Sequence, residues 1–370
     1  MIILPFTSSE ATLETAGGKG MNLARLTQAG FAVPRGFIIS TNAYREFVNA
    51  HHGLPTIQSA VANLSAEDAG ALERASTQIR VAFSAGKMPE EIESAIRAAY
   101  VDFNNKPVAV RSSATAEDLP DLSFAGQQDT YLNVIGIEQL LAAVINCWSS
   151  LWTARAIGYR IRNHIDHSEA ALAVVVQEMI ESEASGVLFT ANPLSGLRSE
   201  SVIDATLGLG EALVSGQVEP DHYVVDTVHQ KIIAKTLGAK KISTRGKTGG
   251  GVEVIEENAE TRQALSDEEI LAIAATGGQI QKEYDFPQDI EWALANNNLY
   301  ILQSRAITSL YPLPKESFDP LMIWFSLGAF QGMLGAITPL GQDTLRIFFS
   351  TAAKMFGAQI RYDETDVLMP

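Results

Sequence analysis

The stretch from Val108 to Asp118 joins an apolar run to a row of small and hydroxyl side chains, with one arginine between them. Pro107 to Val110 predicts a buried strand, and the residues after Arg111 show no apolar periodicity, which predicts a loop. Peptide N–H groups, hydroxyls and a guanidinium together suit a phosphate group. A surface loop in which Arg111 pairs with Glu117 or Asp118 explains the same composition, and both interpretations stay open.

A second candidate phosphate site is Gly17-Gly18-Lys19-Gly20, which opens a helical run that ends at Gly30. Glycine N–H groups at a helix N-terminus, with a lysine among them, can hold phosphate with the help of the helix dipole. The Walker pattern is absent, because no second glycine-lysine-serine element follows.

Residues 288–305 form two alternating runs around an asparagine triplet, which predicts a β-hairpin. By the period of two, Asp289 and Glu291 share one face of the first strand, and Gln303 and Arg305 share one face of the second. If the two faces coincide, the cluster supplies oxygen ligands for Mg²⁺ and a guanidinium for phosphate. The alternative is a solvated face with a Glu–Arg cross-strand pair.

Further elements must position these residues. The apolar run 171–180 predicts a central strand, and its lone amide, Gln177, must find a partner or a ligand there. Residues 221–226 and 230–236 predict paired strands, whereas 240–251, with its basic residues and three consecutive glycines, predicts an irregular segment that is either a linker or a lid.

Helical patterns alternate with these strands. They cover most of residues 41–103, a long amphipathic run over 137–164, and a run from a capping box at Ser266 to about Tyr284. The predicted fold class is therefore α/β (α+β).

Composition limits the possible partners. The formal charge is −16, from 43 acidic and 27 basic residues, which argues against nucleic acid or an anionic membrane as a partner. Cys147, the only cysteine, excludes an internal disulfide and is expected to be buried. His164 and His167 have a spacing that could ligate a metal, but no third ligand is near, which favours surface histidines.

We expect a cytoplasmic location, because the first residues do not resemble a signal peptide. Residues 321–340 are apolar over about the length of a bilayer span. Several glycines and polar residues interrupt them, which favours a buried helix or two short helices.

Four motifs occur in a fixed order. They are Gly17-Gly18-Lys19-Gly20; Arg111-Ser112-Ser113-Ala114-Thr115-Ala116-Glu117-Asp118; Gln177 before Ser185-Gly186-Val187-Leu188-Phe189-Thr190; and Asp289-Ile290-Glu291-Trp292 with Gln303-Ser304-Arg305. Over about residues 10–310 this combination resembles the ATP-binding domain of the phosphoenolpyruvate synthase and pyruvate, phosphate dikinase family, which has an ATP-grasp fold with the nucleotide between two lobes. Residues 123–131, 159–161 and 208–216 are most similar to the rifampicin phosphotransferase branch.

The resemblance implies a reaction in which ATP gives AMP and phosphate, and the β-phosphoryl group passes through a histidine on a separate domain to an acceptor. It implies that the nucleotide contacts a set of five residues and that Mg²⁺ is held by Glu291 and Gln303, while Arg305 braces the phosphates. The five are Lys19, Arg111, Gly126, Thr130 and Gln177. Lys19, Arg111 and Arg305 would be the catalytic residues. Gly126 and Thr130 rest on the resemblance alone.

None of the six histidines has the family's relay context, so we expect a fragment of a longer enzyme, whose phosphohistidine and acceptor domains would be the partners of this chain. The expected domains are an N-terminal lobe over 1–190, a C-terminal lobe over 191–310, a linker over 311–320 and the start of a helical acceptor domain over 321–370. The leading hypothesis is the ATP-binding part of an AMP-forming, Mg²⁺-dependent phosphotransferase, with pyruvate, a rifamycin or another acceptor. The alternative is a nucleotide-binding or regulatory module without phosphoryl transfer.

Overall fold

The computed structural model describes residues 1–50, 53–115, 118–119, 122–123, 130–168, 170–257, 259–310 and 351. The chain divides into two units, Met1–Thr308 and Ser309–Pro370, and everything below concerns the first. The expected linker over 311–320 and the expected helical domain over 321–370 lie outside the described residues, apart from Thr351, and so does the apolar stretch 321–340.

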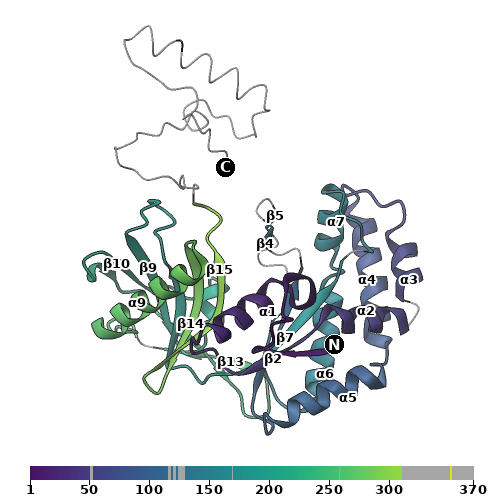
Figure 1. Cartoon of the computed structure of the whole chain (residues 1–370), viewed down its shortest axis with the longest axis horizontal. Helices are drawn as coiled ribbons and strands as arrows, with labels where there is room; N and C mark the ends of the chain where they lie inside the picture. Colours follow the sequence, from purple (N-terminus) through teal and green to yellow (C-terminus); the bar gives the residue numbers. More distant parts are fainter. Residues whose placement is uncertain are drawn as a thin grey trace. The chain divides into compact units, whose positions relative to one another are not determined.

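The first sheet has five antiparallel strands in the order β1-β2-β7-β3-β6. Figure 1 labels two of its strands, β2 and β7. Its strands are β1 (Ile3–Pro5), β2 (Gly36–Ile39), β3 (Val108–Ala114), β6 (Thr130–Val134) and β7 (Leu172–Glu178). The strand predicted at 171–180 is therefore confirmed, and it is central. A separate short ribbon joins β4 (Asp118–Leu119) to β5 (Leu122–Ser123).

Strand β7 is apolar on both faces because helices cover both sides of the first sheet. Val174 and Val176 pack into the larger core, whereas Ala173 and Val175 pack into a smaller core on the opposite face. This alternation explains why the strand is a continuous apolar run in the sequence.

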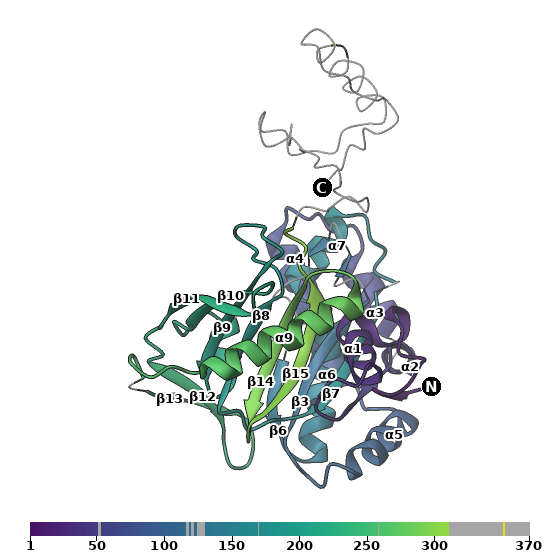
Figure 2. The same cartoon turned by 60° about the vertical axis from the view of Figure 1, so that its left-hand side comes forward.

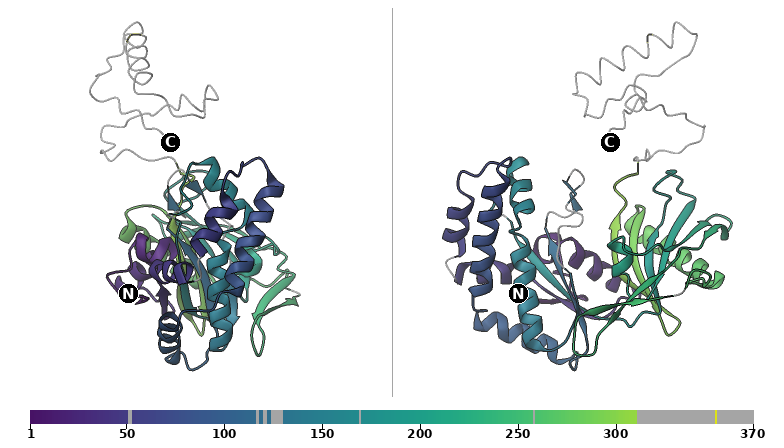
Figure 3. Two further views of the ribbon diagram at one scale, coloured as in Figure 1. Left: turned by 90° about the vertical axis from the view of Figure 1, so that its right-hand side faces the viewer. Right: turned by 180° about the vertical axis from the view of Figure 1, so that it is seen from behind.

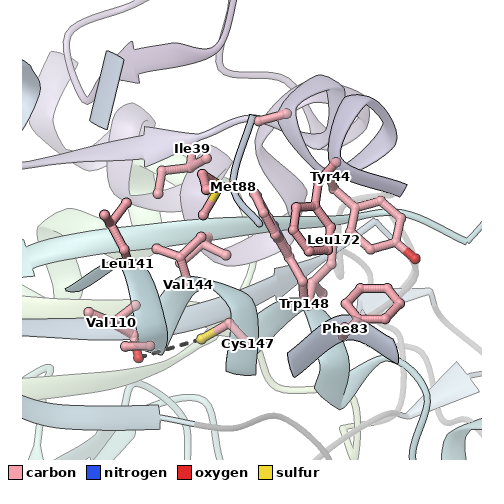
Figure 4. Packing of buried hydrophobic residues seen from close by; sticks show 14 of the residues in the cluster. Ile39, Tyr44, Phe83, Met88, Val110, Leu141, Val144, Cys147, Trp148 and Leu172 are labelled. Atoms are coloured by element: carbon pink, nitrogen blue, oxygen red, sulfur yellow. Dashed lines mark hydrogen bonds between the residues drawn. The ribbon is translucent and has the colours of Figure 1, made fainter. Parts of the chain in front are cut away.

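The larger core lies among helices that come mostly from residues 41–162 (Figure 3). These are α2 (Thr41–Ala50), α3 (Gly53–Val61), α4 (Ala69–Ala85), α5 (Glu90–Val101), α6 (Ile137–Ser150) and α7 (Ala154–Arg162). Figure 4 shows Trp148 and Cys147 of α6 among the packed side chains, with the thiol of Cys147 directed to the carbonyl oxygen of Val110. The prediction that Cys147 is buried is confirmed.

The long helix predicted over 137–164 is in fact two helices. Helix α6 ends at Ser150, and α7 begins at Ala154 after Thr153, whose hydroxyl accepts a hydrogen bond from the Ala156 amide. Within the described residues, Ile137–Arg162 has the length and hydropathy of a membrane span, but 61% of its most apolar window is buried inside the fold. Packing in the core accounts for this apolar character.

The second sheet has six antiparallel strands in the order β11-β10-β9-β8-β14-β15. They are β8 (Ala184–Phe189), β9 (Glu200–Leu207), β10 (Asp221–Asp226), β11 (Lys231–Thr236), β14 (Gln288–Ala295) and β15 (Asn298–Ala306). Helix α9 (Asp267–Tyr284) lies across this sheet (Figure 2) and starts at the predicted capping box of Ser266 and Glu269. The predicted strand pair 221–226 and 230–236 is confirmed as β10 and β11.

Helix α1 (Leu13–Gln28) lies between the two sheets, since Leu23 packs into the smaller core of the first sheet and Leu26 into the core of the second. The segment after it is also tied to the second sheet, because the amide of Ile301 on β15 donates a hydrogen bond to the carbonyl oxygen of Ala32 at 2.9 Å. The two sheets are therefore joined by packing and by hydrogen bonds.

The prediction that residues 240–251 are irregular is wrong for the first half of this segment. Residues Ile242–Gly246 form β12, which pairs with β13 (Val252–Glu256). Lys240 is fully buried and pairs with the buried carboxylate of Asp221. It therefore does not contribute to a basic surface, because tertiary packing has enclosed it with its counter-charge.

One further prediction needs correction and another needs extension. The predicted loop after Arg111 begins later, since β3 continues to Ala114 and buries the side chains of Ser112 and Ser113. The helix predicted to start at Gly17–Gly20 is present, but a short helical segment from Leu13 precedes it, and the non-helical Gly17 (φ 67°) forms the kink between the two. In both places small residues serve close packing between elements.

Candidate functional site

A cavity of about 380 Å³ lies between the two sheets, within the usual size range of small-molecule sites. Its walls come from β3, β6 and β7 of the first sheet, from β8, β14 and β15 of the second, and from α1 and α8 (Glu211–Val214). The lining includes Lys19, Arg111, Thr130, Gln177, Glu291, Gln303 and Arg305. Residues far apart in the sequence thus meet in one hollow, as the resemblance required. Gly126 lies outside the described residues.

The hairpin β14–β15 brings together the four residues expected to share a face. Asp289 stands opposite Arg305, and Glu291 stands opposite Gln303, so the two predicted faces coincide. Nε and Nη2 of Arg305 both lie 2.8 Å from Oδ2 of Asp289. The alternative interpretation expected a cross-strand pair between a glutamate and Arg305. Arg305 does form a cross-strand ion pair, but the carboxylate is that of Asp289, whereas Glu291 is directed elsewhere.

Glu291 faces the other sheet. Its Oε2 lies 3.5 Å from Nη2 of Arg111, whose Nη1 donates to the carbonyl oxygen of Leu302 at 3.2 Å. The Arg111 side chain is only 12% exposed, and its Nε has no hydrogen-bond partner within the part of the chain that the structure describes. The side chain of Arg111 therefore extends from β3 and contacts the second sheet. The expected alternative partners, Glu117 and Asp118, have side chains outside the described residues.

Gln177 has a buried polar group without a partner, as do Arg111 and Trp292 in the same cavity wall. It is 2% exposed on β7, and its Nε2 has no hydrogen-bond partner among the described residues. A buried donor left in this way costs about 1–3 kcal/mol. The prediction that this amide needs a partner or a ligand therefore has a structural counterpart, since the side chain borders the cavity.

Helix α1 holds Lys19 at the cavity through its contact with β3. A Cβ atom at Gly17 would lie 2.2 Å from the carbonyl oxygen of Ser113, so only glycine allows this approach. The Ser113 hydroxyl accepts a hydrogen bond from the Gly20 amide at 3.1 Å and donates one to the carbonyl oxygen of Ala16 at 2.8 Å. The kink and Ser113 together fix the turn that carries Lys19.

Burial and neighbouring charges set the state of the acidic groups. Burial raises the pKa of Asp289 above its ordinary value, and the nearby Arg305 opposes this effect. Burial would also raise the pKa of Glu178, but hydrogen bonds from Lys106 and Arg35 outweigh it and leave that pKa below its ordinary value. Glu178 is thus an ionised, partnered group at the cavity edge.

The sequence did not identify the apolar wall of the cavity. Met179 and Ile180 follow β7, while Leu209 and Val214 flank the predicted turn at Gly210. That turn was recognised from its glycines, but nothing in its pattern showed which element it would face. An apolar surface next to cationic groups suits a ligand with an apolar ring and a charged tail.

Among the residues that the structure describes, the two histidines with metal-like spacing form no metal site with neighbouring acids. His164 is exposed, whereas His167 is half-buried against Trp152 and accepts a hydrogen bond from Nε of Arg160 at 3.0 Å. His167 is therefore not the surface residue that was expected. Across the described residues, no group of three or more His, Cys, Asp or Glu side chains is arranged to hold a metal ion.

The fold and the cavity agree with a match at the family level. The family described as pyruvate phosphate dikinase, AMP/ATP-binding domain, matches residues 13–317. The chain therefore belongs to this family of nucleotide-binding domains, and the resemblance inferred from the four motifs is confirmed.

Individual relatives are similar along most of this chain. Rifampicin phosphotransferase from Bacillus cereus is 40% identical over 371 residues, which cover 99% of this chain and 42% of the relative. A probable phosphoenolpyruvate synthase from Methanothermobacter thermautotrophicus is 43% identical over 309 residues, which cover 82% of this chain and 45% of the relative. The chain thus spans less than half the length of these two curated relatives.

Proposed function

We propose that this chain is the ATP-binding part of an AMP-forming, Mg²⁺-dependent phosphotransferase of the dikinase type. The observation that carries the proposal is the cavity itself, in which three cationic side chains, three carboxylates and two amides from both sheets and from helices α1 and α8 border one hollow. We further propose an ATP-grasp arrangement with the nucleotide between two lobes. Because β8 pairs within the second sheet, we place the lobe boundary between Glu178 and Ala184 instead of at residue 190.

The chemistry of the side chains supports the roles that we assign at the phosphates. Three cationic side chains would neutralise and orient the phosphate chain: Lys19, Arg111 and Arg305. In phosphoryl transfer, most of the catalytic contribution of the protein is positioning and stabilisation of the phosphate charge. Arg111 is suited to this role because its buried Nε has no acceptor among the described residues, and a phosphate oxygen would supply one.

One amide and one hydroxyl also have proposed contacts with the nucleotide. Gln177 would donate its unpartnered Nε2–H to the ligand, and Thr130, at the edge of β6, would offer its hydroxyl. Met179 and Ile180, together with Val214, would cover the apolar base. Gly126 is retained as a proposed contact from the resemblance alone.

The residues present also fit a magnesium ion. Glu291 and Gln303 stand opposite one another in the hairpin and both border the cavity, where they offer a carboxylate and an amide oxygen. Mg²⁺ commonly takes only one or two protein oxygens and completes its shell with phosphates and water. When bound with ATP, the ion would neutralise charge on the phosphate oxygens.

The rest of the reaction lies with partners of this chain. We propose that the β-phosphoryl group passes to a histidine on a further domain and then to an acceptor on another. The names of the relatives point to pyruvate or a rifamycin as acceptor classes. We also propose a cytoplasmic location, since the longest apolar helical stretch among the described residues packs inside the fold.

Calorimetry of ATP binding tests the proposal, with Glu291→Gln as the variant. We expect the wild type to bind ATP more tightly with Mg²⁺ than with a chelator, and the variant to lose about tenfold or more of its affinity only when Mg²⁺ is present. Glu283→Gln is the control, because that carboxylate pairs with Arg25 outside the cavity. If the wild type does not bind ATP, the proposal fails.

Formation of AMP by the intact gene product separates the two candidate functions. Release of AMP that depends on pyruvate or a rifamycin supports the phosphotransferase. Tight ATP binding without AMP formation for any tested acceptor would instead support a nucleotide-binding or regulatory module.

A further inference from the structure

Strand β6 contains a bulge that redirects one side chain. Val134 pairs with Val108, and Tyr131 pairs with Val110, so that Leu132 and Asn133 together stand opposite a single residue of β3. Asn133 adopts the left-handed conformation, with φ 56°, and is 4% exposed. Bulges commonly change the direction of a side chain next to a functional site. Here the bulge presents the Asn133 amide to the β12–β13 hairpin.

The turn of that hairpin, residues 247–251, closes around Asn133. Nδ2 of Asn133 donates to the carbonyl oxygens of Lys247 at 2.8 Å and of Gly251 at 2.5 Å, and the Gly251 amide donates to the carbonyl oxygen of Asn133 at 3.0 Å. Gly250 has φ 116°, and a Cβ there would lie 3.0 Å from the side-chain oxygen of Gln139. We call Asn133 and the turn 247–251 the clasp.

The other part of the same hairpin supports the opposite wall of the cavity. The carbonyl oxygen of Thr244 on β12 accepts a hydrogen bond from the Leu209 amide at 2.8 Å, and Gly208 pairs with Thr244 in an isolated bridge. Leu209, Gly210 and Glu211 border the cavity, as do Thr130 and Leu132 on β6. The hairpin therefore joins two walls that belong to different sheets.

We propose that Asn133 is a positioning residue of the nucleotide cavity, which acts through the clasp by holding the β6 wall at a fixed distance from the wall at Leu209–Glu211. Asn133 does not itself border the cavity. Its loss lets the two walls move apart, so that the nucleotide binds more weakly and leaves faster. The effect on the nucleotide rests on the function proposed above, whereas the coupling of the walls does not.

The isosteric change Asn133→Asp tests the clasp. It keeps the shape and the tolerance for the left-handed backbone, but it removes both N–H donors and sets a carboxylate against two carbonyl oxygens. We expect the affinity for Mg²⁺–ATP to fall about tenfold, which corresponds to the net free energy of one or two hydrogen bonds. We also expect faster hydrogen exchange at the Leu209 amide in the nucleotide-free protein.

Asn192→Asp is the matched control. The Asn192 side chain donates one hydrogen bond, to Glu200, and accepts two, from the amides of Leu194 and Ser195, in the loop between β8 and β9. This variant loses stability in the same chemical way but has no connection to the hairpin. Both its ATP affinity and its exchange at Leu209 should match the wild type.

Gly250→Ala changes the turn 247–251 instead of Asn133, because alanine is strained at the positive φ of Gly250. The two changes should not add in the double variant, since either one opens the same contact. Normal exchange at Leu209 in both variants would overturn the proposal. If the wild type does not bind ATP, the proposed function fails while the exchange measurement still decides on the clasp. If the wild type binds and Asn133→Asp binds equally well, the positioning role alone is wrong.

Discussion

The guanidinium of Arg111 and the carboxylate of Glu291 lie 3.5 Å apart, from Nη2 to Oε2, although they belong to different sheets. Each is a residue for which we propose a separate role, Arg111 at the phosphates and Glu291 at Mg²⁺. In the structure the two groups partly satisfy one another. Entry of Mg²⁺–ATP would replace this contact by two stronger ones, one for each group.

Gln177→Leu should separate stability from binding. Leucine removes the unpartnered buried Nε2, so we expect the free energy of unfolding to stay equal or to rise by about 1 kcal/mol. ATP affinity should fall, because the donor to the ligand is lost. Chemical denaturation and calorimetry on the same preparation measure both quantities.

Gln288→Leu is the control for that pair of measurements. Gln288 is also buried, but it donates to the carbonyl oxygen of Phe286 and accepts from the hydroxyl of Ser304. Its replacement should therefore lower stability. A Gln177→Leu protein that is destabilised and still binds ATP normally would contradict the proposed role of Gln177.

Arg305→Lys should impair phosphoryl transfer while it leaves the fold intact. Lysine keeps the charge beside Asp289, so the change in stability should stay below about 1 kcal/mol, as for most partly exposed ion pairs. It loses the planar fork that matches phosphate oxygens, and AMP formation should fall by about tenfold or more. Arg25→Lys is the control, since Arg25 is equally exposed and pairs with Glu283 away from the cavity. Unchanged AMP formation would remove Arg305 from the site.

Gly17→Ala should destabilise the protein by more than about 2 kcal/mol. The added Cβ meets the carbonyl oxygen of Ser113 at 2.2 Å, and the positive φ adds backbone strain. Gly30→Ala shares the positive φ but meets nothing within 4 Å, so it should cost only about 1 kcal/mol. Thermal unfolding of the two variants compares the two effects. Equal losses would show that the close approach to Ser113 contributes nothing.

His167 should make stability depend on pH. Burial, followed by the nearby Arg160, lowers its pKa from 6.5 to about 4. The unfolded chain therefore takes up a proton at a higher pH than the folded protein, and the free energy of unfolding should decrease as pH falls from about 6.5 to about 4. His167→Gln keeps an acceptor for Arg160 but cannot be protonated in this range, so it should flatten that slope. Denaturation curves across this range, with exposed His229→Gln as control, measure the effect.

The hairpin β14–β15 shows how much of the site the sequence could predict. The alternation around the asparagine triplet determines which side chains of each strand share a face. The pairing of Glu291 with Gln303 depends in addition on a bulge between Glu291 and Trp292, which shifts the register set by the turn and which the pattern does not show. Gln177 was identifiable from local pattern alone, as the only amide within an apolar strand.

Tertiary contacts explain the predictions that were wrong. Lys240 looks like part of a basic, glycine-rich loop, and only the folded chain shows that it is buried against Asp221. Ser112 and Ser113 look like loop residues, because a strand packed closely against α1 needs small side chains that the usual apolar pattern does not include. The cavity walls at Met179 and Leu209 depend on how two sheets pack, which no window of sequence contains.

The bond from the Ile301 amide to the carbonyl oxygen of Ala32 has a consequence for self-association. Strand β15 is the last strand of its sheet, and such strands readily recruit an extended segment from another molecule. In this protein the segment after α1 already occupies one of the donors along that border. Intermolecular strand addition at β15 would have to displace it first, which protects concentrated protein against polymerisation at that border.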